Sequence, residues 1–143
     1  MKSIQHLLDE KARSPVTVAP GDTAQRALTL LAEHDIGAVL VLEAGRVVGV
    51  FSERDFARKV ALPGKSSQDT RIHEVMSGHV FYVTTSQTVE ECLAIMTDRH
   101  IRHLPVVDED QNLLGILSIG DLVKETISLQ AFKIEQLERY ITG

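Results

Sequence analysis

A serine and an aspartate occur twice in this chain with the same spacing and similar neighbours. The two stretches are GVFSERDF, which contains Ser52 and Asp55, and GILSIGDL, which contains Ser118 and Asp121. Both residue types are common helix N-caps, because their side-chain oxygens accept hydrogen bonds from unpaired backbone N–H groups. Capping alone explains either stretch taken singly. Their repetition favours an additional binding role for Ser118 and Asp121, and the two roles are compatible.

The two stretches belong to a longer internal repeat. An offset of 65 residues aligns apolar positions of the two halves, namely Val18 with Val83, Leu28 with Leu93, and Ile36 with Ile101. After one added residue, an offset of 66 aligns Ser52 with Ser118 and Asp55 with Asp121. One structural unit is therefore used twice, because fixed-period self-similarity is the signature of repeated structure.

Each half of the sequence predicts the order strand, helix, strand, strand, helix. The helices are indicated by apolar residues at i, i+3, i+4 and i+7, which are Ala24, Ala27, Leu28 and Leu31 in one half and Val89, Cys92, Leu93 and Met96 in the other. Thr88 with Glu91 predicts a capping box at one helix start, and Asp22 with Gln25 predicts a looser one at the other. Short apolar runs predict the strands, at 16–18, 38–42 and 47–51 and at 81–83, 104–107 and 113–117.

The predicted fold class is α/β (α+β), with two pseudo-symmetric β-α-β-β-α repeats packed sheet to sheet. A small sheet with helices on one face leaves the other face open, and a second unit can cover it. We assign residues 1–62 to the first repeat, 63–72 to a linker, 73–126 to the second repeat and 127–143 to a C-terminal helix extension of one module. Apolar residues recur every seven positions in that extension, at Ile127, Ile134 and Ile141.

Composition excludes several classes of partner. The formal charge of −5 argues against nucleic acid, which requires dominant clusters of Lys and Arg. The single cysteine, Cys92, excludes an internal disulfide and is compatible with a reducing compartment, so we expect a cytoplasmic protein. The N-terminus lacks a long apolar stretch, and no apolar run approaches the roughly 18 residues of a membrane helix. We therefore expect no membrane partner.

Motifs of known catalytic sites are missing from the sequence. GKSS at 64–67 resembles a phosphate-binding loop, but Lys59 stands where that motif requires glycine. His100 and His103 lack further ligands at a spacing typical of metal sites. The sequence therefore predicts no catalytic residue, no metal and no catalytic cofactor, and we expect a protein that is not an enzyme.

In order and spacing, these segments resemble the cystathionine-β-synthase (CBS) domain pair, over residues 1 to about 126. The segments that carry the resemblance are VTV, IGAVLV, IRHLPVV, GVFSERD and GILSIGD. The resemblance implies a disc-like module that commonly forms a homodimer and binds adenosine-containing ligands between its repeats. It also implies a sensor of AMP, ADP, ATP, S-adenosylmethionine or NAD. AMP or NAD is favoured over ATP or S-adenosylmethionine, because few basic residues are present for a triphosphate.

The resemblance places one ligand cleft at the second repeat. It implies that Asp121 accepts hydrogen bonds from the ribose diol and that Ser118 and Gly120 lie near phosphate. Ile116 would contact the base. The remaining residues implied for this cleft are Arg102 and His103 towards the phosphate, and Thr17, Ile36, Gly37 and Ala38 on the facing wall.

A pseudo-symmetric second cleft is implied at the first repeat. It would use Asp55, Ser52, Arg54 and Val50, with Ile101 and Arg102 opposite. Gly37 and Ala38 occupy the positions that correspond to Arg102 and His103, so a phosphate there would depend on Arg54, Arg58 or Lys65.

The interpretation that follows is a regulatory module that binds an adenine nucleotide and acts on another polypeptide through its shape or its dimer interface. The apolar C-terminal helix is the expected contact, with a second copy or with that target. Two alternatives stay open at this point, a structural dimerisation module without ligand and an enzyme that uses a nucleotide cleft.

Overall fold

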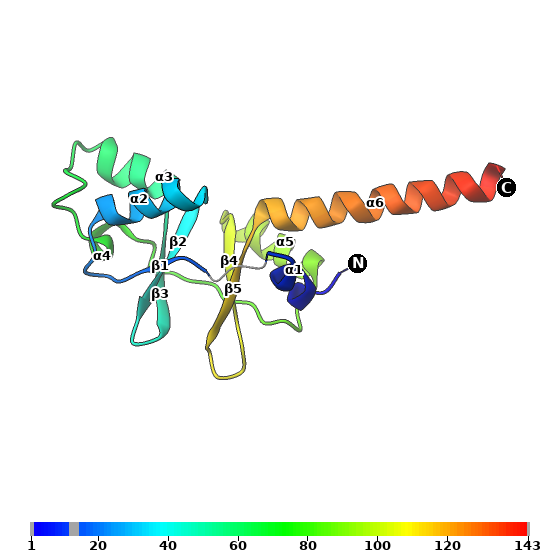
Figure 1. Ribbon diagram of the computed structural model, residues 1–143, viewed down its shortest axis with the longest axis horizontal. Helices are drawn as coiled ribbons and strands as arrows, with labels where there is room; N and C mark the ends of the chain where they lie inside the picture. The colour runs from blue at the N-terminus through cyan, green and yellow to red at the C-terminus, as the bar shows by residue number, and fades with distance from the viewer. Residues whose placement is uncertain (1, 12–14, 143) are drawn as a thin grey trace.

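The structure, a computed structural model, consists of two sheet-and-helix units side by side (Figure 1). It describes residues 2–11 and 15–142, with side chains described as far as 139. The first unit contains β1 (Thr17–Val18), α2 (Ala24–His34), β2 (Ala38–Glu43), β3 (Arg46–Ser52), α3 (Glu53–Asp55) and the π-helix η1 (Phe56–Ala61). The second contains α5 (Val89–Arg99), β4 (His103–Val107), β5 (Leu113–Ser118) and α6 (Ile119–Thr142). Two further helices, α1 (Ile4–Lys11) and α4 (Ile72–Val75), precede the units.

The strand pairing follows the predicted order in both units. In the first, β1 is parallel to β2, and β2 is antiparallel to β3. In the second, β4 and β5 form the corresponding antiparallel pair. The expected strand at 81–83 is reduced to one parallel bridge between Val83 and Val106. The two-repeat fold class is thereby confirmed, although one strand of the second unit is very short.

Corresponding threonines cap the first helix of each unit. Thr23 Oγ1 accepts a hydrogen bond from Arg26 N at 3.1 Å, and Thr88 Oγ1 accepts one from Glu91 N at 3.0 Å. The predicted cap at Asp22 is wrong, because its carboxylate instead accepts a hydrogen bond from Ala19 N in the preceding turn. The duplication, which aligns Thr23 with Thr88, points to the correct cap.

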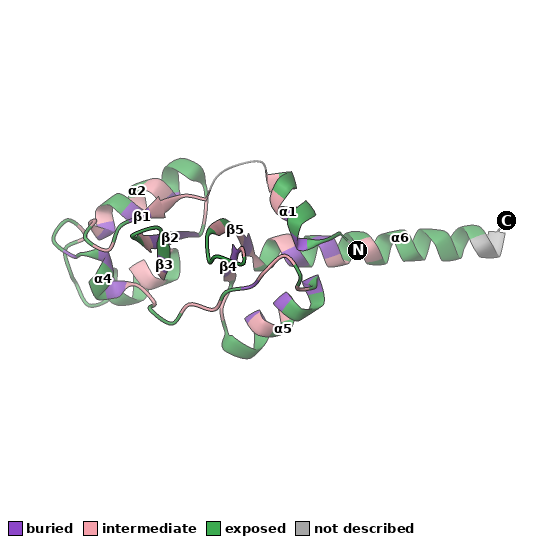
Figure 2. Ribbon diagram, turned by 90° about the horizontal axis from the view of Figure 1, so that it is seen from below, coloured by how far each residue is buried: buried purple, intermediate pink, exposed green. Residues whose placement is uncertain are grey.

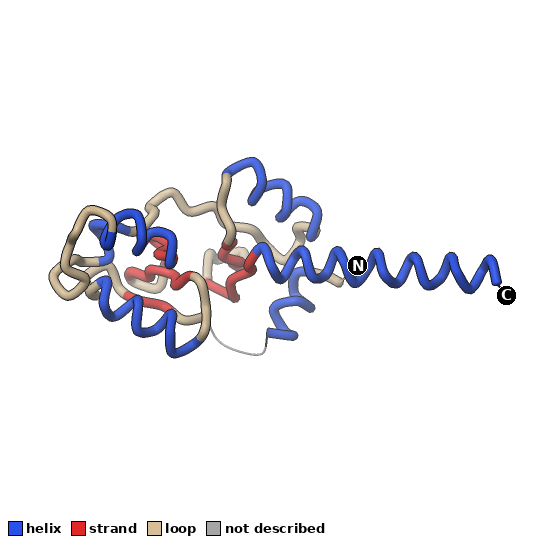
Figure 3. The backbone as a smooth tube through the Cα atoms, turned by 90° about the horizontal axis from the view of Figure 1, so that it is seen from above, coloured by secondary structure: helices blue, strands red, loops and turns tan. Residues whose placement is uncertain are grey.

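Both faces of the first sheet are covered. Val39, Val41 and Phe51 belong to a buried cluster with the helices of their own unit. Ala38 and Leu40 point to the opposite face, because side chains alternate along a strand, and they are buried as well. Figure 3 shows the strands of the two units next to each other near the middle of the molecule. This arrangement supports the predicted sheet-to-sheet packing.

The helix that precedes each unit packs against the other unit. Ile4 and Leu7 of α1 are buried in the core of the second unit, with Leu104 and Leu117. Helix α4 is buried in the core of the first unit through Ile72 and Val75. The two units are therefore tied together by exchanged helices.

Helix α6 extends well beyond the two units (Figure 2). Its first turns are buried at Leu122 and Glu125, whereas Ile127, Ile134 and Leu137 are 60%, 57% and 62% exposed. The side chain of Ile141 lies outside the described residues. Within the described part of the chain, none of the helices combines the length and apolar character that crossing a membrane requires. The cytoplasmic location stays a prediction from composition.

Leu104 and Leu62 provide a matched test of this core. Leu104 is fully buried in the second unit, and Leu62 is 80% exposed. Leu104→Ala should lower the free energy of unfolding by about 2–5 kcal/mol, because it removes buried contacts and leaves a cavity. Leu62→Ala should change it by less than about 0.5 kcal/mol. Urea unfolding followed by circular dichroism measures both, and equal effects would contradict the described core.

Candidate functional site

A cavity of about 300 Å³ lies between the two units, at the strand-to-helix junction of the second. The N-terminal region and both units line it. They contribute Leu8, Lys11, Pro15 and Val16 from the N-terminal region, Asp35, Ile36, Gly37 and Ala38 from the first unit, and His103, Leu114, Gly115, Ile116, Ser118 and Asp121 from the second. Apolar walls thus surround a small group of polar side chains, as in many ligand sites.

Ser118 and Asp121 cap the start of α6 reciprocally. Ser118 Oγ accepts a hydrogen bond from Asp121 N at 3.1 Å, and Asp121 Oδ2 accepts one from Ser118 N at 2.8 Å. This geometry fixes the carboxylate beside the cavity. The capping role is therefore present, and it orients Asp121 towards any ligand that enters.

Lys11 provides the counter-ion of Asp121. Its Nζ lies 2.8 Å from Asp121 Oδ2 and also donates a hydrogen bond to the Ile116 carbonyl at 3.0 Å. Burial raises the pKa of Asp121, but the hydrogen bonds from Lys11 and Ser118 outweigh it and lower that pKa overall. Asp121 is therefore a carboxylate at neutral pH. Sequence reasoning missed Lys11, because 110 residues separate it from its partner.

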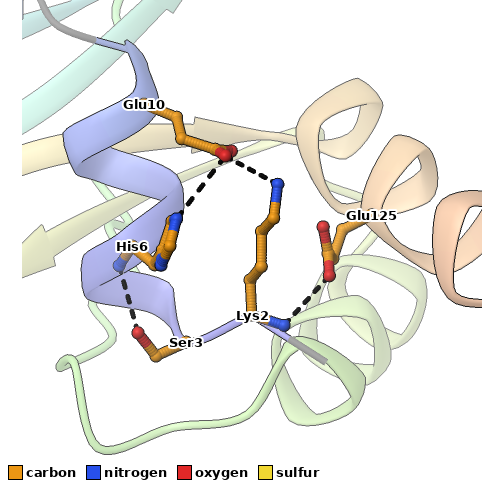
Figure 4. A network of polar contacts seen from close by, with 5 residues as sticks. All are labelled: Lys2, Ser3, His6, Glu10 and Glu125. Atoms are coloured by element: carbon orange, nitrogen blue, oxygen red, sulfur yellow. Dashed lines mark hydrogen bonds and ion pairs between the residues drawn. The ribbon is translucent and has the colours of Figure 1, made fainter.

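The helix that carries Lys11 is fixed to α6 at its other end. Lys2 N donates a hydrogen bond to Glu125 Oε1 at 2.9 Å, and Glu125 is only 7% exposed. Figure 4 shows this contact beside the Lys2–Glu10 ion pair, in which the two charged atoms are 2.6 Å apart. Asp121 and Glu125 lie four residues apart on α6, so one face of α6 holds Lys11 at the end of α1 and Lys2 just before its start.

His103 enters the cavity opposite Gly37. A β-carbon at Gly37 would lie 3.6 Å from the His103 ring, which is ordinary van der Waals contact, so the two residues face each other closely. Burial and the positive charge of Lys11 lower the pKa of His103, and Asp121 opposes them only in part. His103 is therefore mainly neutral at pH 7 and presents one N–H donor and one acceptor.

Most residues expected at this cleft line the cavity. Those that do are Asp121, Ser118, Ile116, His103, Ile36, Gly37 and Ala38. Arg102 is exposed, Gly120 lies in the exposed first turn of α6, and Thr17 pairs with Leu40 in the sheet. The lining residues that sequence reasoning missed are Leu8, Lys11, Pro15, Val16, Asp35, Leu114 and Gly115.

The corresponding site of the first unit has different surroundings. Ser52 and Asp55 form the same reciprocal cap, but the ion pair of Asp55 is with Lys59 of the same helical segment, at 3.3 Å. The Val50 backbone pairs with Ser77. The side chains of Arg54, Arg58 and Lys65 are exposed, and Ile101 packs against the core of the second unit. None of these first-unit residues is among those that line the cavity at Asp121.

The family model described as CBS domain matches this chain twice, at residues 11–62 and 72–128. The chain belongs to the CBS-domain family. It is 34% identical to the CBS domain-containing protein YhcV of Bacillus subtilis, over 84% of each chain. It is 32% identical to the mitochondrial CBS domain-containing protein CBSX3 of Arabidopsis thaliana, over 85% of this chain and 61% of that protein.

Solved CBS-domain structures share the fold. The CBS-domain containing protein ATU1752 of Agrobacterium tumefaciens is 39% identical with a TM-score of 0.80, over 87% of this chain and 99% of that one. The CBS domain protein PAE2072 of Pyrobaculum aerophilum, solved in complex with AMP, is 28% identical with a TM-score of 0.74, over 84% and 89%.

The contact between Lys11 and the cavity predicts a shift in the titration of His103. Lys11→Met removes a positive charge that disfavours the imidazolium, so the pKa of His103 should rise. Lys133→Met, on the exposed part of α6, is the control and should leave it unchanged. Proton NMR titration measures both, and an unshifted His103 in Lys11→Met would show that Lys11 lies elsewhere in solution.

Proposed function

We propose that this CBS-domain pair is a regulatory module that binds an adenine nucleotide in the cleft at Asp121. One observation carries the proposal. The Asp121 carboxylate is fixed at the edge of a cavity between the two units, in a chain whose relative PAE2072 was solved with AMP. A carboxylate in such a position accepts hydrogen bonds from the hydroxyl groups of a ribose, as acidic residues do in other nucleotide sites.

The remaining groups suit the other parts of the nucleotide. Val16, Ile36 and Ile116 form apolar walls on which an adenine ring would lie. His103 offers one N–H towards a phosphate. At the start of α6, the N–H groups of Ile119 and Asp121 already donate to the Arg102 carbonyl and to Ser118 Oγ. Ligand sites combine apolar walls with a few polar groups in this way.

The size of the cavity favours a mononucleotide. At about 300 Å³ it is at the lower end of the range of ligand sites, which extends from about 300 to 1,000 Å³. We therefore place AMP ahead of the dinucleotide NAD and the triphosphate ATP. The cleft at Asp55 is a weaker candidate, because the basic residues expected there are exposed.

Paired alanine variants test this proposal. AMP at 100 times its dissociation constant should add about 2.7 kcal/mol to the free energy of unfolding. Asp121→Ala should abolish this stabilisation by AMP. Asp55→Ala removes the equivalent cap from the first unit and should still be stabilised by AMP. Thermal unfolding with and without AMP measures all three.

Two results would contradict the proposal. If neither AMP, ATP, NAD nor S-adenosylmethionine stabilises the wild-type protein, the chain is a structural module and not a nucleotide sensor. If AMP still stabilises Asp121→Ala, the nucleotide binds elsewhere. Turnover of the nucleotide in the same samples would instead indicate an enzyme.

We further propose that α6 pairs with α6 of a second copy and so forms a homodimer. Val123, Ile127, Ile134 and Leu137 are exposed at heptad spacing. Lys124 precedes most of this stretch and Glu138 follows it, so an antiparallel copy would bring opposite charges together. Because Asp121 starts the same helix, a change at the cleft would be transmitted to the dimer interface or to a protein target that reads it.

A substitution within the apolar stripe tests the dimer. Ile134→Asp should convert a dimer into a monomer, because it places a charge in an apolar contact. Gln136→Asp, on another face of the same exposed stretch, is the control and should leave the mass unchanged. Sedimentation equilibrium measures both masses. A wild-type monomer, or a dimer that withstands Ile134→Asp, would contradict this interface.

A further inference from the structure

Lys11 is hydrogen-bonded to acceptor atoms of the cleft that a bound nucleotide would also contact. Its Nζ is hydrogen-bonded to Asp121 Oδ2 and to the Ile116 carbonyl, and its side chain is 30% exposed. A ribose that donates to Asp121 would compete with Lys11 for the same carboxylate oxygen. Since Lys11 is long, partly exposed and at the end of α1, it can leave this carboxylate while its helix stays in place.

The charges that line the cavity make Lys11 important for an anionic ligand. Its described titratable lining residues are Lys11, Asp35, His103 and Asp121. His103 has a lowered pKa and is mainly neutral at pH 7, and Arg102 is exposed and is not among the lining residues. Among the lining residues that the structure describes, a phosphate, which carries a charge of about −1.5 to −2 at pH 7, would therefore meet two carboxylates and one cation, Lys11.

We propose that Lys11 is the anion-binding residue of this cleft and that it selects adenosine ligands with a negatively charged group at the 5′ position. This inference rests on the proposed function and adds to it a residue that determines specificity. When the ribose hydroxyls donate to Asp121, the Lys11 ammonium moves to the 5′ phosphate. Adenosine derivatives with an uncharged or cationic 5′ group gain nothing from this movement.

The first unit provides a matched control within the same chain. Lys59 is paired with Asp55, as Lys11 is with Asp121, but it comes from the same helical segment as its partner and lies outside the cavity lining. Removing Lys59 thus breaks a Lys–Asp pair at the equivalent motif without changing the charge of the cleft.

The test compares two ligands that differ in charge only at the 5′ position, AMP and 5′-methylthioadenosine. Isothermal titration of the full chain should show that Lys11→Met weakens AMP about tenfold or more, because a charge-assisted hydrogen bond is lost. The same variant should not weaken the binding of 5′-methylthioadenosine, because no charged contact to this ligand is lost and Lys11 no longer competes with the ribose for Asp121. Lys11→Arg should restore most of the AMP affinity, and Lys59→Met should bind both ligands as the wild type does.

Three outcomes would overturn this inference and leave the proposed function in place. If Lys11→Met loses affinity for both ligands equally, Lys11 only shapes the cleft. If the variant gains affinity for both equally, Lys11 only competes with the ligand for Asp121. Unchanged binding of both would mean that it does not contact the ligand. If the wild type binds neither ligand, the proposed function fails first and the role of Lys11 fails with it.

Discussion

Each of the two small sheets has two faces to bury and receives helices on only one of them. In the first unit, Val39 and Val41 pack towards the helices, while Ala38 and Leu40 are buried on the opposite face. The two units must therefore meet through their sheets, since an exposed apolar sheet face is costly in water. The cleft follows from this constraint, because it lies where the ends of the packed strands leave space beside the start of α6.

The internal repeat contains two equivalent Ser–Asp motifs, which differ in the residues packed around them. Both aspartates cap a helix in the same way. A long-range contact with Lys11 engages Asp121, whereas the nearby Lys59 engages Asp55. Packing around the preceding glycines differs too, with Met76 against Gly49 and Leu8 against Gly115. The two motifs are therefore equivalent in their own backbone geometry and differ in the residues that surround them.

Much of this fold could be predicted because its signals are local and occur twice. Periodicity placed α2 and α5, and the alignment of Thr23 with Thr88 contains the correct caps. The reduced strand at Val83 was not predictable, since its pairing depends on the partner strand. The role of Lys11 in the cavity could not be predicted either, because it depends on the packing of α1 against the second unit. No local sequence pattern indicates that packing. The secondary structure within each repeat could therefore be predicted from the sequence, whereas the contacts between the two units could not.

A crystal structure of the full chain with AMP would show directly whether Asp121 holds the nucleotide. We expect a nucleotide between the two units, with a ribose hydroxyl within hydrogen-bond distance of Asp121 and the adenine against Ile116 and Ile36. Asp121 would then hold both the start of α6 and the ligand. AMP bound at Asp55 while the cleft at Asp121 stays empty, or AMP bound with no contact to either aspartate, would contradict it.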